Sequence, residues 1–287
     1  MNAFALLASS DTGWTPAGIG RAATLALHDE LSLAPKPGLV TLIDSGSHDD
    51  MDAHTFMRSL FALRRYFAQI AEAGVGGADF AALEHCGIAA EARMLAATDG
   101  VNTHRGAIFM LGLLCAAAGA ALAERQGALH PARLREVLLR NWGDALRARS
   151  RRTPTLPGGI AARRYGLRSA SEEAALAFPV LFETAVPALS AALARGLTLQ
   201  QARLDTLFHV MAVLDDSNLA HRGGLEGLRY AQRVARRFLD EGGAARAGGL
   251  QHAQAICDEF VARRLSPGGA ADTLAAACWV MRVCRMP

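Results

Sequence analysis

Acidic side chains that could hold a metal ion gather in two short segments of this chain. Residues 44–52, with the sequence DSGSHDDMD, hold four Asp and His48, and a second acidic pair follows an apolar run. Protein-bound Mg²⁺ usually takes one or two carboxylates, with water and substrate phosphates as further ligands. Asp also caps helices, because its carboxylate accepts hydrogen bonds from the free N–H groups of the first turn. The two segments therefore predict either metal ligands or helix caps. The candidate metal ligands are Asp49, Asp50, Asp52, Asp215 and Asp216.

The only lysine of the chain stands in a segment that could hold a phosphate. The sequence has 30 Lys and Arg residues, and all of them except Lys36 are arginine. An ammonium group is a compact charge that fits beside a phosphate oxygen in a tight pocket. Pro35 and Pro37 restrict the backbone on both sides, and Gly38 permits a close turn or approach. We interpret Lys36 as a phosphate-binding residue on a stiff loop, with a chance surface lysine as the alternative.

Two more polar segments stand beside apolar helical patterns and could bind an anion. Residues 101–106 (VNTHRG) precede an uncharged run at 107–123, and residues 221–224 read HRGG. A helix N-terminus offers free N–H groups to an anion, and an arginine adds charge. Asn102 or Thr103 could instead cap the following helix. Because several such loops open or close apolar helices, we expect them to share one cleft.

Hydrophobic periodicity predicts helices along the whole chain. Apolar residues within 56–70, 204–214 and 225–238 recur every three or four positions, as on one face of a helix. The first of these helices is predicted to end near Gly74. The only strand-like segment, 39–43, is interpreted as a loop. We predict an all-α, single-domain multi-helix bundle with active-site loops at helix ends. It covers residues 1–287, with residues 1–20 as a flexible N-terminal segment.

Composition excludes several classes of protein. Hydrophobic residues make up 51% and charged residues 20%, which excludes a disordered chain. A net charge of +3 without a basic tract argues against a nucleic-acid partner. Five cysteines without a CxxC pair argue against a disulfide framework and favour the reducing cytoplasm. The uncharged run 107–123 is shorter than the roughly twenty residues that cross a bilayer, so we predict a buried central helix and no membrane partner.

The motifs of this chain, taken in order, resemble those of the triphosphoribosyl-dephospho-CoA synthases. They are PKPGLV at 35–40, SGSHDDMD at 45–52, VNTHRGAIF at 101–109, LDDSN at 214–218, HRGG at 221–224 and SPGGAAD at 266–272. The resemblance covers nearly the whole chain. Each motif alone is weak, but the ordered set is specific.

The resemblance implies an enzyme that uses ATP as a ribosyl donor. Such enzymes transfer the 5-triphosphoribosyl group of ATP to the 2′-hydroxyl of 3′-dephospho-CoA and release adenine, with Mg²⁺ as the expected cofactor. Their product is the precursor of the prosthetic group on the acyl-carrier subunit of malonate decarboxylase or citrate lyase, and it passes to a holo-acyl-carrier-protein synthase. Arg105, where many relatives have lysine, resembles the malonate decarboxylase branch. We expect a cytoplasmic enzyme, with a homodimer as one assembly.

This chemistry suggests roles for particular residues. Breaking the C1′–N9 bond of ATP builds oxocarbenium-like charge, which a carboxylate can stabilise, and proton transfer needs an acid and a base. The resemblance thus implies metal or oxocarbenium roles for the acidic residues and proton transfer by one histidine, although a lone histidine is more often structural. The candidate catalytic residues are His48, Asp49, Asp50, His104 and Asp216. The candidate nucleotide- and phosphate-binding residues are Lys36, Gly38, Ser45, Asn102, Thr103, Arg105, Gly106, Asn218, Arg222 and Gly223.

The chain also departs from the family pattern, and two rival functions stay open. Ser169 and Ala177 stand where relatives often have glycine, so a positive backbone φ at these positions is not expected. An HD-type metal-dependent phosphohydrolase would use His28, His48–Asp49 and Asp216, and it would release phosphate from nucleotides. A non-enzymatic helical interaction protein would use only the apolar faces, and ATP would not stabilise it against unfolding.

Overall fold

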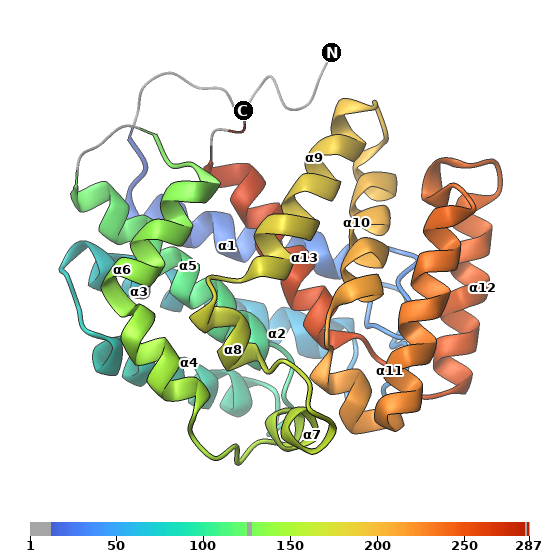
Figure 1. Cartoon of the computed structure of the whole chain (residues 1–287), viewed down its shortest axis with the longest axis horizontal. Helices are drawn as coiled ribbons and strands as arrows, with labels where there is room; N and C mark the ends of the chain where they lie inside the picture. Colours follow the sequence, from blue (N-terminus) through green and yellow to red (C-terminus); the bar gives the residue numbers. More distant parts are fainter. Residues whose placement is uncertain (1–12, 125–127, 285, 287) are drawn as a thin grey trace.

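The protein is helical throughout the part of the chain that the computed structural model describes. This part comprises residues 13–124, 128–284 and 286, and it contains no β-strand. The elements, which include a π-helix (η1) and a 3₁₀-helix (η2), are α1 Pro16–Leu31, α2 Ala53–Leu63, α3 Tyr66–Val75, α4 Phe80–Ala97, α5 Arg105–Ala123, α6 Pro131–Ser150, α7 Pro157–Tyr165, α8 Ala170–Ala175, η1 Val180–Ala185, α9 Val186–Ala194, α10 Leu199–Val213, α11 Ser217–Asp240, η2 Gly243–Ala245, α12 Gly249–Ala262 and α13 Gly268–Val283 (Figure 1). The predicted all-α fold is confirmed.

One apolar core runs through the described residues, from α1 to α13. Its helices begin where the sequence supplies side-chain caps, as at Thr15, Asp52 and Asp79, whose oxygens accept from amides of the first turn. Residues 1–12 of the predicted flexible segment 1–20 lie outside the described residues, and α1 begins within that segment.

Helix α5 lies at the centre of the bundle and packs against α1, α3, α6 and α13. Two glycines bring the backbones of α3 and α5 into contact. An added Cβ on Gly74 would lie 2.1 Å from the Ala116 carbonyl oxygen, and one on Gly119 would lie 2.0 Å from that of Ala71. Helix α5 is the one helix among the described residues that is long and apolar enough to cross a membrane, but 72% of its apolar window is buried inside the fold. The prediction of a buried central helix over 107–123 is confirmed.

The helix predicted to run from residue 56 to about 74 is divided in two. Helical hydrogen bonding is interrupted at Arg64–Arg65, so that α2 ends at Leu63 and α3 begins at Tyr66. Both arginines keep right-handed helical backbone angles, so the chain bends there without turning back. Tyr66 enters the core at the bend, and its hydroxyl donates to the Ile108 carbonyl oxygen 3.0 Å away. The single-helix prediction was wrong because the apolar period continues through the bend.

Helices α10 and α11 meet at the second acidic segment. The apolar face predicted over 204–214 is buried, and α10 ends at Val213. Asp216 then begins α11 as its N-cap. The HRGG segment 221–224 lies at an internal break of α11, where Gly224 has φ 65° and ψ −169°. A glycine is needed at this break because residues with a Cβ almost never adopt these angles.

The turn after α8 uses left-handed backbone angles without a glycine. Ala177 and Phe178 have φ of 56° and 53°, and η1 follows them. The expectation that Ala177 avoids a positive φ was therefore wrong. The buried carboxylate of Glu173 holds this turn, since it accepts from the Val180 amide at 3.3 Å and from the Arg168 guanidinium at 2.9 Å. Surrounding contacts thus impose a conformation that the alanine itself disfavours.

The connection between α1 and α2, residues 32–52, contains turns but no helix or strand, as predicted for 39–43. The Ser47 amide donates to the Gly38 carbonyl oxygen at 3.1 Å, and the Ser47 hydroxyl donates to the Leu265 carbonyl oxygen at 2.6 Å. Gly38 has φ 64°, and an added Cβ there would lie 2.0 Å from the Leu265 carbonyl oxygen. The connection is therefore fixed against the segment that precedes α13.

Candidate active site

A cleft of about 1690 Å³ opens where several helix ends meet. Residues of α6, α7 and α8 form one wall, and α1, α2 and the segment before α2 contribute to the other. The starts of α5, α11 and α13 also line the cleft. In Figure 1, α7 lies on the near side of the molecule and α2 lies behind it. The predicted convergence of loops at helix ends is thus present.

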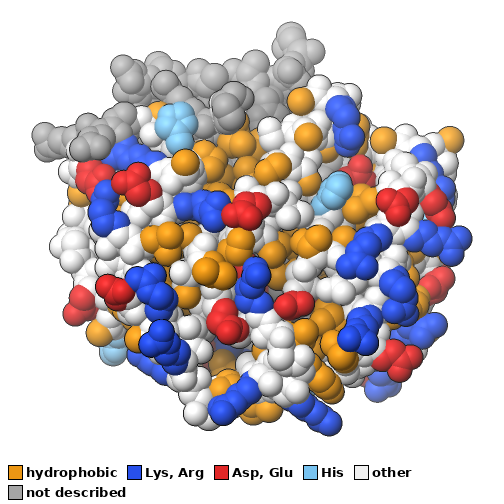
Figure 2. All heavy atoms as spheres, in the orientation of Figure 1, with side chains coloured by type: hydrophobic (Ala, Val, Ile, Leu, Met, Phe, Trp, Pro, Cys, Tyr) orange, Lys and Arg blue, Asp and Glu red, His pale blue; other side chains and the backbone are white. Residues whose placement is uncertain are grey.

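The wall formed by residues 147–172, called the arginine wall below, is strongly basic. The arginines that line the cleft are Arg105, Arg147, Arg149, Arg151, Arg152, Arg163, Arg168 and Arg222, and six of these eight belong to this wall. Glu172 is the one carboxylate that the wall contributes to the cleft. Arg149 and Arg152 share Glu84 at 2.6 and 2.8 Å, which holds both near the cleft. Figure 2 shows basic and acidic side chains interspersed with apolar ones over the face that carries α6 to α11. Such a wall suits a polyanionic ligand.

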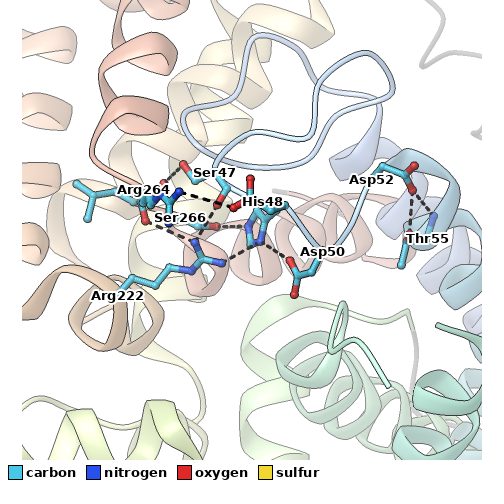
Figure 3. Close-up of polar contacts among 10 residues, drawn as sticks. Ser47, His48, Asp50, Asp52, Thr55, Arg222, Arg264 and Ser266 are labelled. Atoms are coloured by element: carbon cyan, nitrogen blue, oxygen red, sulfur yellow. Dashed lines mark hydrogen bonds and ion pairs between the residues drawn. The ribbon is translucent and has the colours of Figure 1, made fainter. Parts of the chain in front are cut away.

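His48, Arg222 and Ser266 form a hydrogen-bonded group at the cleft (Figure 3). Arg222 donates to His48 Nδ1 at 3.0 Å, so the ring proton lies on Nε2, which donates to Ser266 Oγ at 2.9 Å. Arg222 also donates to the Ser47 carbonyl oxygen at 3.0 Å. Burial, followed by the charge of Arg222, lowers the pKa of His48. Both nitrogens of the neutral ring are therefore occupied by neighbouring side chains.

The first acidic segment contains a helix cap and two exposed carboxylates, of which Asp49 lies 3.9 Å from the Arg264 guanidinium. Asp52 caps α2, because it accepts from both the amide and the hydroxyl of Thr55 at 2.8 Å (Figure 3), and these bonds lower its pKa. Asp49 and Asp50 are exposed, and Asp50 lies 3.7 Å from His48 Nδ1. Neither of them lines the cleft, although both are next to residues that do. They stay available at its edge.

The two carboxylates of the second acidic segment have different environments. Asp216 is buried, and it accepts from the first amides of α11 and from the Ala270 amide at 3.0 Å. Burial raises the pKa of Asp216, while these amides oppose the shift. Asp215 lines the cleft and accepts from the Arg168 amide at 3.0 Å. Asp216 therefore joins helix starts together, and Asp215 is the carboxylate that a ligand can reach.

Lys36 lies behind the cleft wall. Its ammonium group is fully buried, pairs with the Glu30 carboxylate and donates to the Glu30 carbonyl oxygen at 2.9 Å. Burial lowers the pKa of Lys36, and the charge of Glu30 opposes this shift. Glu30 lines the cleft, whereas Lys36 does not. Lys36 therefore serves as the counter-ion of a buried carboxylate, and its ammonium group does not line the cleft in which a phosphate could bind.

His104 lines the cleft at the start of α5. Its ring is 3% exposed and meets the Phe56 ring edge-on, with centroids 4.9 Å apart. Its Nδ1 lies 2.6 Å from Ser59 Oγ, which accepts from the Thr103 hydroxyl at 2.7 Å. Its Nε2 has no hydrogen-bond partner among the described residues. Burial, helped by the charge of Lys36, lowers the pKa of His104 to about 3, so the ring is neutral at neutral pH.

Asp272, near the start of α13, faces the cleft beside the start of α5. An added Cβ on Gly106 would lie 2.0 Å from Asp272 Oδ2, so the missing side chain at 106 makes room for this carboxyl group. Asp272 hydrogen-bonds to the Ala107 amide. Burial, followed by the charges of Glu30 and Asp216, raises the pKa of Asp272 well above its usual value. The protonated form of Asp272 is therefore favoured.

The other sequence-predicted residues divide between the cleft and its support. Asn102 accepts from the Arg105 amide at 3.2 Å, but the N-cap of α5 is His104, so neither Asn102 nor Thr103 is the predicted cap. Arg105 lines the cleft and pairs with Glu91 at 2.6 Å. Thr103, Gly106 and Asn218 also line the cleft. Gly38, Ser45 and Gly223 do not line the cleft.

Comparison with known proteins identifies the family to which this arrangement belongs. A family model described as ATP:dephospho-CoA triphosphoribosyl transferase matches residues 16–286. The chain belongs to this family. The family resemblance read from the motifs is thereby confirmed, and the protein is a transferase.

Curated relatives of this transferase share most of its length. The chain is 37% identical over 261 residues to the probable 2-(5″-triphosphoribosyl)-3′-dephosphocoenzyme-A synthase of Acinetobacter calcoaceticus, covering 91% of this chain and 89% of the relative. It is 38% identical over 271 residues to the protein of the same name from Vibrio cholerae, covering 91% and 86%. The synthase of Escherichia fergusonii is 38% identical over 268 residues, covering 90% and 88%. No solved structure matches the transferase.

The acidic residues predicted as metal ligands of the transferase do not converge. Within residues 13–124, 128–284 and 286, no group of three or more His, Cys, Asp or Glu is placed to hold a metal ion. Asp52 and Asp216 are occupied by helix amides, and Asp215 accepts from a backbone amide. Only the exposed neighbours Asp49 and Asp50 are without such bonds. They fit an Mg²⁺ ion that arrives with phosphates, since Mg²⁺ takes one or two carboxylates.

Two parts of the cleft were not predicted from the sequence of the transferase. Asp272 ends the SPGGAAD motif, but nothing in the chain's local pattern shows that it faces Gly106, 166 positions earlier. The arginine wall contains the run RARSRR at 147–152, which is the densest basic segment of the chain. Its density was a usable signal, although its position at the end of α6 and in the break that follows made it resemble an ordinary solvated helix end.

Proposed function

We propose that this transferase binds ATP and 3′-dephospho-CoA in the cleft and moves the 5-triphosphoribosyl group of ATP to the 2′-hydroxyl of 3′-dephospho-CoA, releasing adenine. One observation carries the proposal: a single cleft is lined both by the arginine wall and by the neutral His104 ring and the acid Asp272. These last two residues, at the starts of α5 and α13, are called the cleft floor below. The arginine wall matches a triphosphate that stays attached to the product. The floor offers preorganised polar groups that would stabilise the charge separated when the bond to adenine breaks.

The reaction exchanges one bond at C1′ of the ribose for another. The C1′–N9 bond breaks and its electron pair leaves on adenine, while the 2′-hydroxyl oxygen of 3′-dephospho-CoA bonds to C1′ and loses its proton. Asp272 donates a proton to the departing adenine, because its raised pKa keeps a proton available. Asp215, which is the cleft-lining member of the predicted acidic set, takes the proton of the 2′-hydroxyl. Proton exchange with water then restores both carboxyl groups.

The expected Mg²⁺ ion fits one pair of residues in this structure. Asp49 and Asp50 would hold it at the cleft edge together with phosphate oxygens and water. Bound there, Mg²⁺ would offset part of the triphosphate charge. Arg222 lines the cleft beside this edge, and Arg105 lines it at the start of α5. Both would contact the same phosphates.

The experiment that tests this function uses the purified full chain with ATP, Mg²⁺ and 3′-dephospho-CoA. Mass spectrometry should detect free adenine and a triphosphoribosyl adduct of 3′-dephospho-CoA in equal amounts. Omitting 3′-dephospho-CoA should abolish the adduct. Release of phosphate or AMP without adenine would contradict the proposal and support a phosphohydrolase.

The product is proposed to serve an acyl carrier protein. We assign it as the precursor of the carrier's prosthetic group, delivered through a holo-acyl-carrier-protein synthase in the cytoplasm. The resemblance at Arg105 favours the carrier of malonate decarboxylase over that of citrate lyase. Incubating the product with that synthase and each apo-carrier should modify the malonate decarboxylase carrier faster. Light scattering at micromolar concentration would test the proposed homodimer.

The phosphohydrolase is the less favoured reading of this geometry. His28 lies near Ser32, His48 binds Arg222 and Ser266, and the carboxylate of Asp216 is occupied by backbone amides. The residues that such an enzyme would need therefore make separate contacts.

A further inference from the structure

His104 lines the cleft, and one nitrogen of its ring is buried without a hydrogen-bond partner among the described residues. The ring is almost fully buried, and its Nε2 is without a hydrogen-bond partner among the described residues. A buried polar atom without a partner costs free energy. A ligand that supplies an acceptor or donor at this atom would recover that cost. The unpartnered nitrogen therefore indicates a contact that forms only with a bound molecule.

The hydrogen-bond chain behind the ring determines which kind of contact this is. The Thr103 hydroxyl donates to Ser59 Oγ at 2.7 Å, and we assign the single hydroxyl proton of Ser59 to the bond with His104 Nδ1, 2.6 Å away. Because Nδ1 accepts, the proton of the neutral ring lies on Nε2. The unpartnered Nε2 of His104, a residue that lines the cleft, is therefore an N–H donor, and a ligand atom that reaches it must be an acceptor.

The surroundings of His104 favour an uncharged ring over a phosphate. Phe56 stands edge-on to the imidazole, and the same side of the cleft is lined by Leu27, Leu39, Val40 and Met51. Lys36, the cation whose charge acts on His104, is already paired with Glu30. The arginine wall, in contrast, places six arginines along the cleft beside its apolar residues. An apolar surface with one neutral donor fits a planar heterocycle that carries an acceptor nitrogen.

We propose that His104 marks the purine subsite, where its Nε2–H donates to a ring nitrogen of the adenine of ATP. This inference rests on the proposed function, because it places the leaving group of that reaction. When the C1′–N9 bond breaks, the electron pair on adenine is shared among its ring nitrogens. A fixed N–H donor at N3 or N7 stabilises that charge without giving up its proton. His104 thus acts as a donor to the leaving group, and it replaces the proton-transfer role that the motif suggested.

The first measurement is the tautomer of His104 in the full chain. Protein labelled with ¹⁵N-histidine should show one neutral ring with its proton on Nε2, unchanged between about pH 5 and 8, whose signal is absent from His104→Gln. Addition of ATP should shift this signal. A His104 ring that carries its proton on Nδ1, or that titrates in this range, would overturn the proposal. Because this readout needs no turnover, it holds even if the proposed transfer reaction fails.

The second measurement separates a donor from a general base. His104→Gln keeps an N–H donor near the position of Nε2 and should lose at most about tenfold in kcat, with the shape of the pH–rate profile unchanged. His104→Leu should lose about 10²–10³-fold, the usual cost of removing one such donor. The exposed His85→Leu, on α4 and outside the cleft, is the matched control. Equal losses in the Gln and Leu variants, or a pH limb lost in Gln, would contradict the donor role.

The third measurement identifies the acceptor. The wild type and His104→Leu are compared with ATP, 3-deaza-ATP and 7-deaza-ATP as donors. One analogue should lower kcat of the wild type by at least about tenfold more than it lowers kcat of the Leu variant, and this identifies N3 or N7. Equal ratios for both analogues would sink the purine contact. If the wild type releases no adenine from ATP, the proposed function fails, while the shift of the His104 signal by ATP still tests the subsite.

Discussion

The arginine wall and the cleft floor hold charged groups in opposite ways. In the arginine wall, partly or fully exposed guanidinium groups form ion pairs with carboxylates outside the cleft, as Arg149 and Arg152 do with Glu84. In the floor, His104 and Asp272 are enclosed by helix starts. Burial lowers the pKa of His104 and raises the pKa of Asp272, so the neutral form of each is favoured. Exposed cations attract a polyanion but are screened by salt, whereas buried neutral groups act at short range. The difference indicates that the wall binds and the floor performs chemistry.

The comparison predicts that the floor carries the largest single effect. Asp272→Asn keeps the size of the side chain but removes the acid, and kcat should fall about 10³-fold, within the usual range for general acid catalysis. The same change should raise the unfolding free energy at pH 7. The reason is that the folded wild type keeps a proton on Asp272 that the unfolded chain releases above about pH 3.8. The wild type therefore loses stability as pH rises from 3.8 toward the pKa of Asp272 in the folded state. Steady-state kinetics and chemical denaturation measure the two effects.

The surface variant Asp240→Asn, at the end of α11, is the control for this change. It should alter neither kcat nor stability measurably. If Asp272→Asn kept near-normal turnover, the distinction between wall and floor would lose its chemical basis.

The second prediction concerns the support of the floor. Lys36→Met leaves the buried Glu30 carboxylate without its counter-ion, and the unfolding free energy should fall by about 3–5 kcal/mol. The double variant with Glu30→Gln should recover most of this loss. Thermal denaturation of the four proteins forms the cycle. A Lys36→Met protein with unchanged stability and a raised KM for ATP would instead place Lys36 on a phosphate.

The third prediction follows from the low pKa of His104. A group whose folded pKa is about 3 against an ordinary value of 6.5 binds fewer protons when folded, so it destabilises the fold as pH falls below 6.5. At about 1.4 kcal/mol per pH unit, the wild type should lose about 2 kcal/mol between pH 6.5 and 5 through this residue. His104→Gln, which cannot titrate, should lack this share, and His85→Gln should keep it. Denaturant titrations at the two pH values give the comparison, and parallel losses would place His104 in a solvated site.

The smallest effect is expected from a single residue of the arginine wall. Arg163→Gln should raise KM for ATP or 3′-dephospho-CoA by about twofold to fivefold with little change in kcat, since exposed ion pairs contribute about 1 kcal/mol or less. The increase should shrink in 0.5 M salt. Its neighbour Arg164, which stacks on Tyr165 and does not line the cleft, is the matched control. A loss of kcat without a change in KM would move Arg163 from binding to chemistry.

Sequence patterns predicted the helices well wherever one apolar face is repeated over several turns. The buried face of α10 follows from the spacing of its apolar residues, and the buried α5 follows from an uncharged run that is apolar on every side. The division at Arg64–Arg65 was missed, since the bend preserves that stripe. The left-handed Ala177 was missed because no glycine marks this turn, which is held by the contacts of Glu173.

The amino-acid sequence by itself determined the helical class, the family and the segments that meet at the cleft, because these depend on local spacing and on ordered motifs. Only the tertiary structure decided what each polar residue contacts. In the folded protein Lys36 is buried against Glu30, and Asp52 and Asp216 accept hydrogen bonds from helix amides. Asp272 lies beside Gly106. Hydrogen bonds and charge interactions act over a few ångströms in space, and residues far apart in the chain reach that distance only when the helices pack.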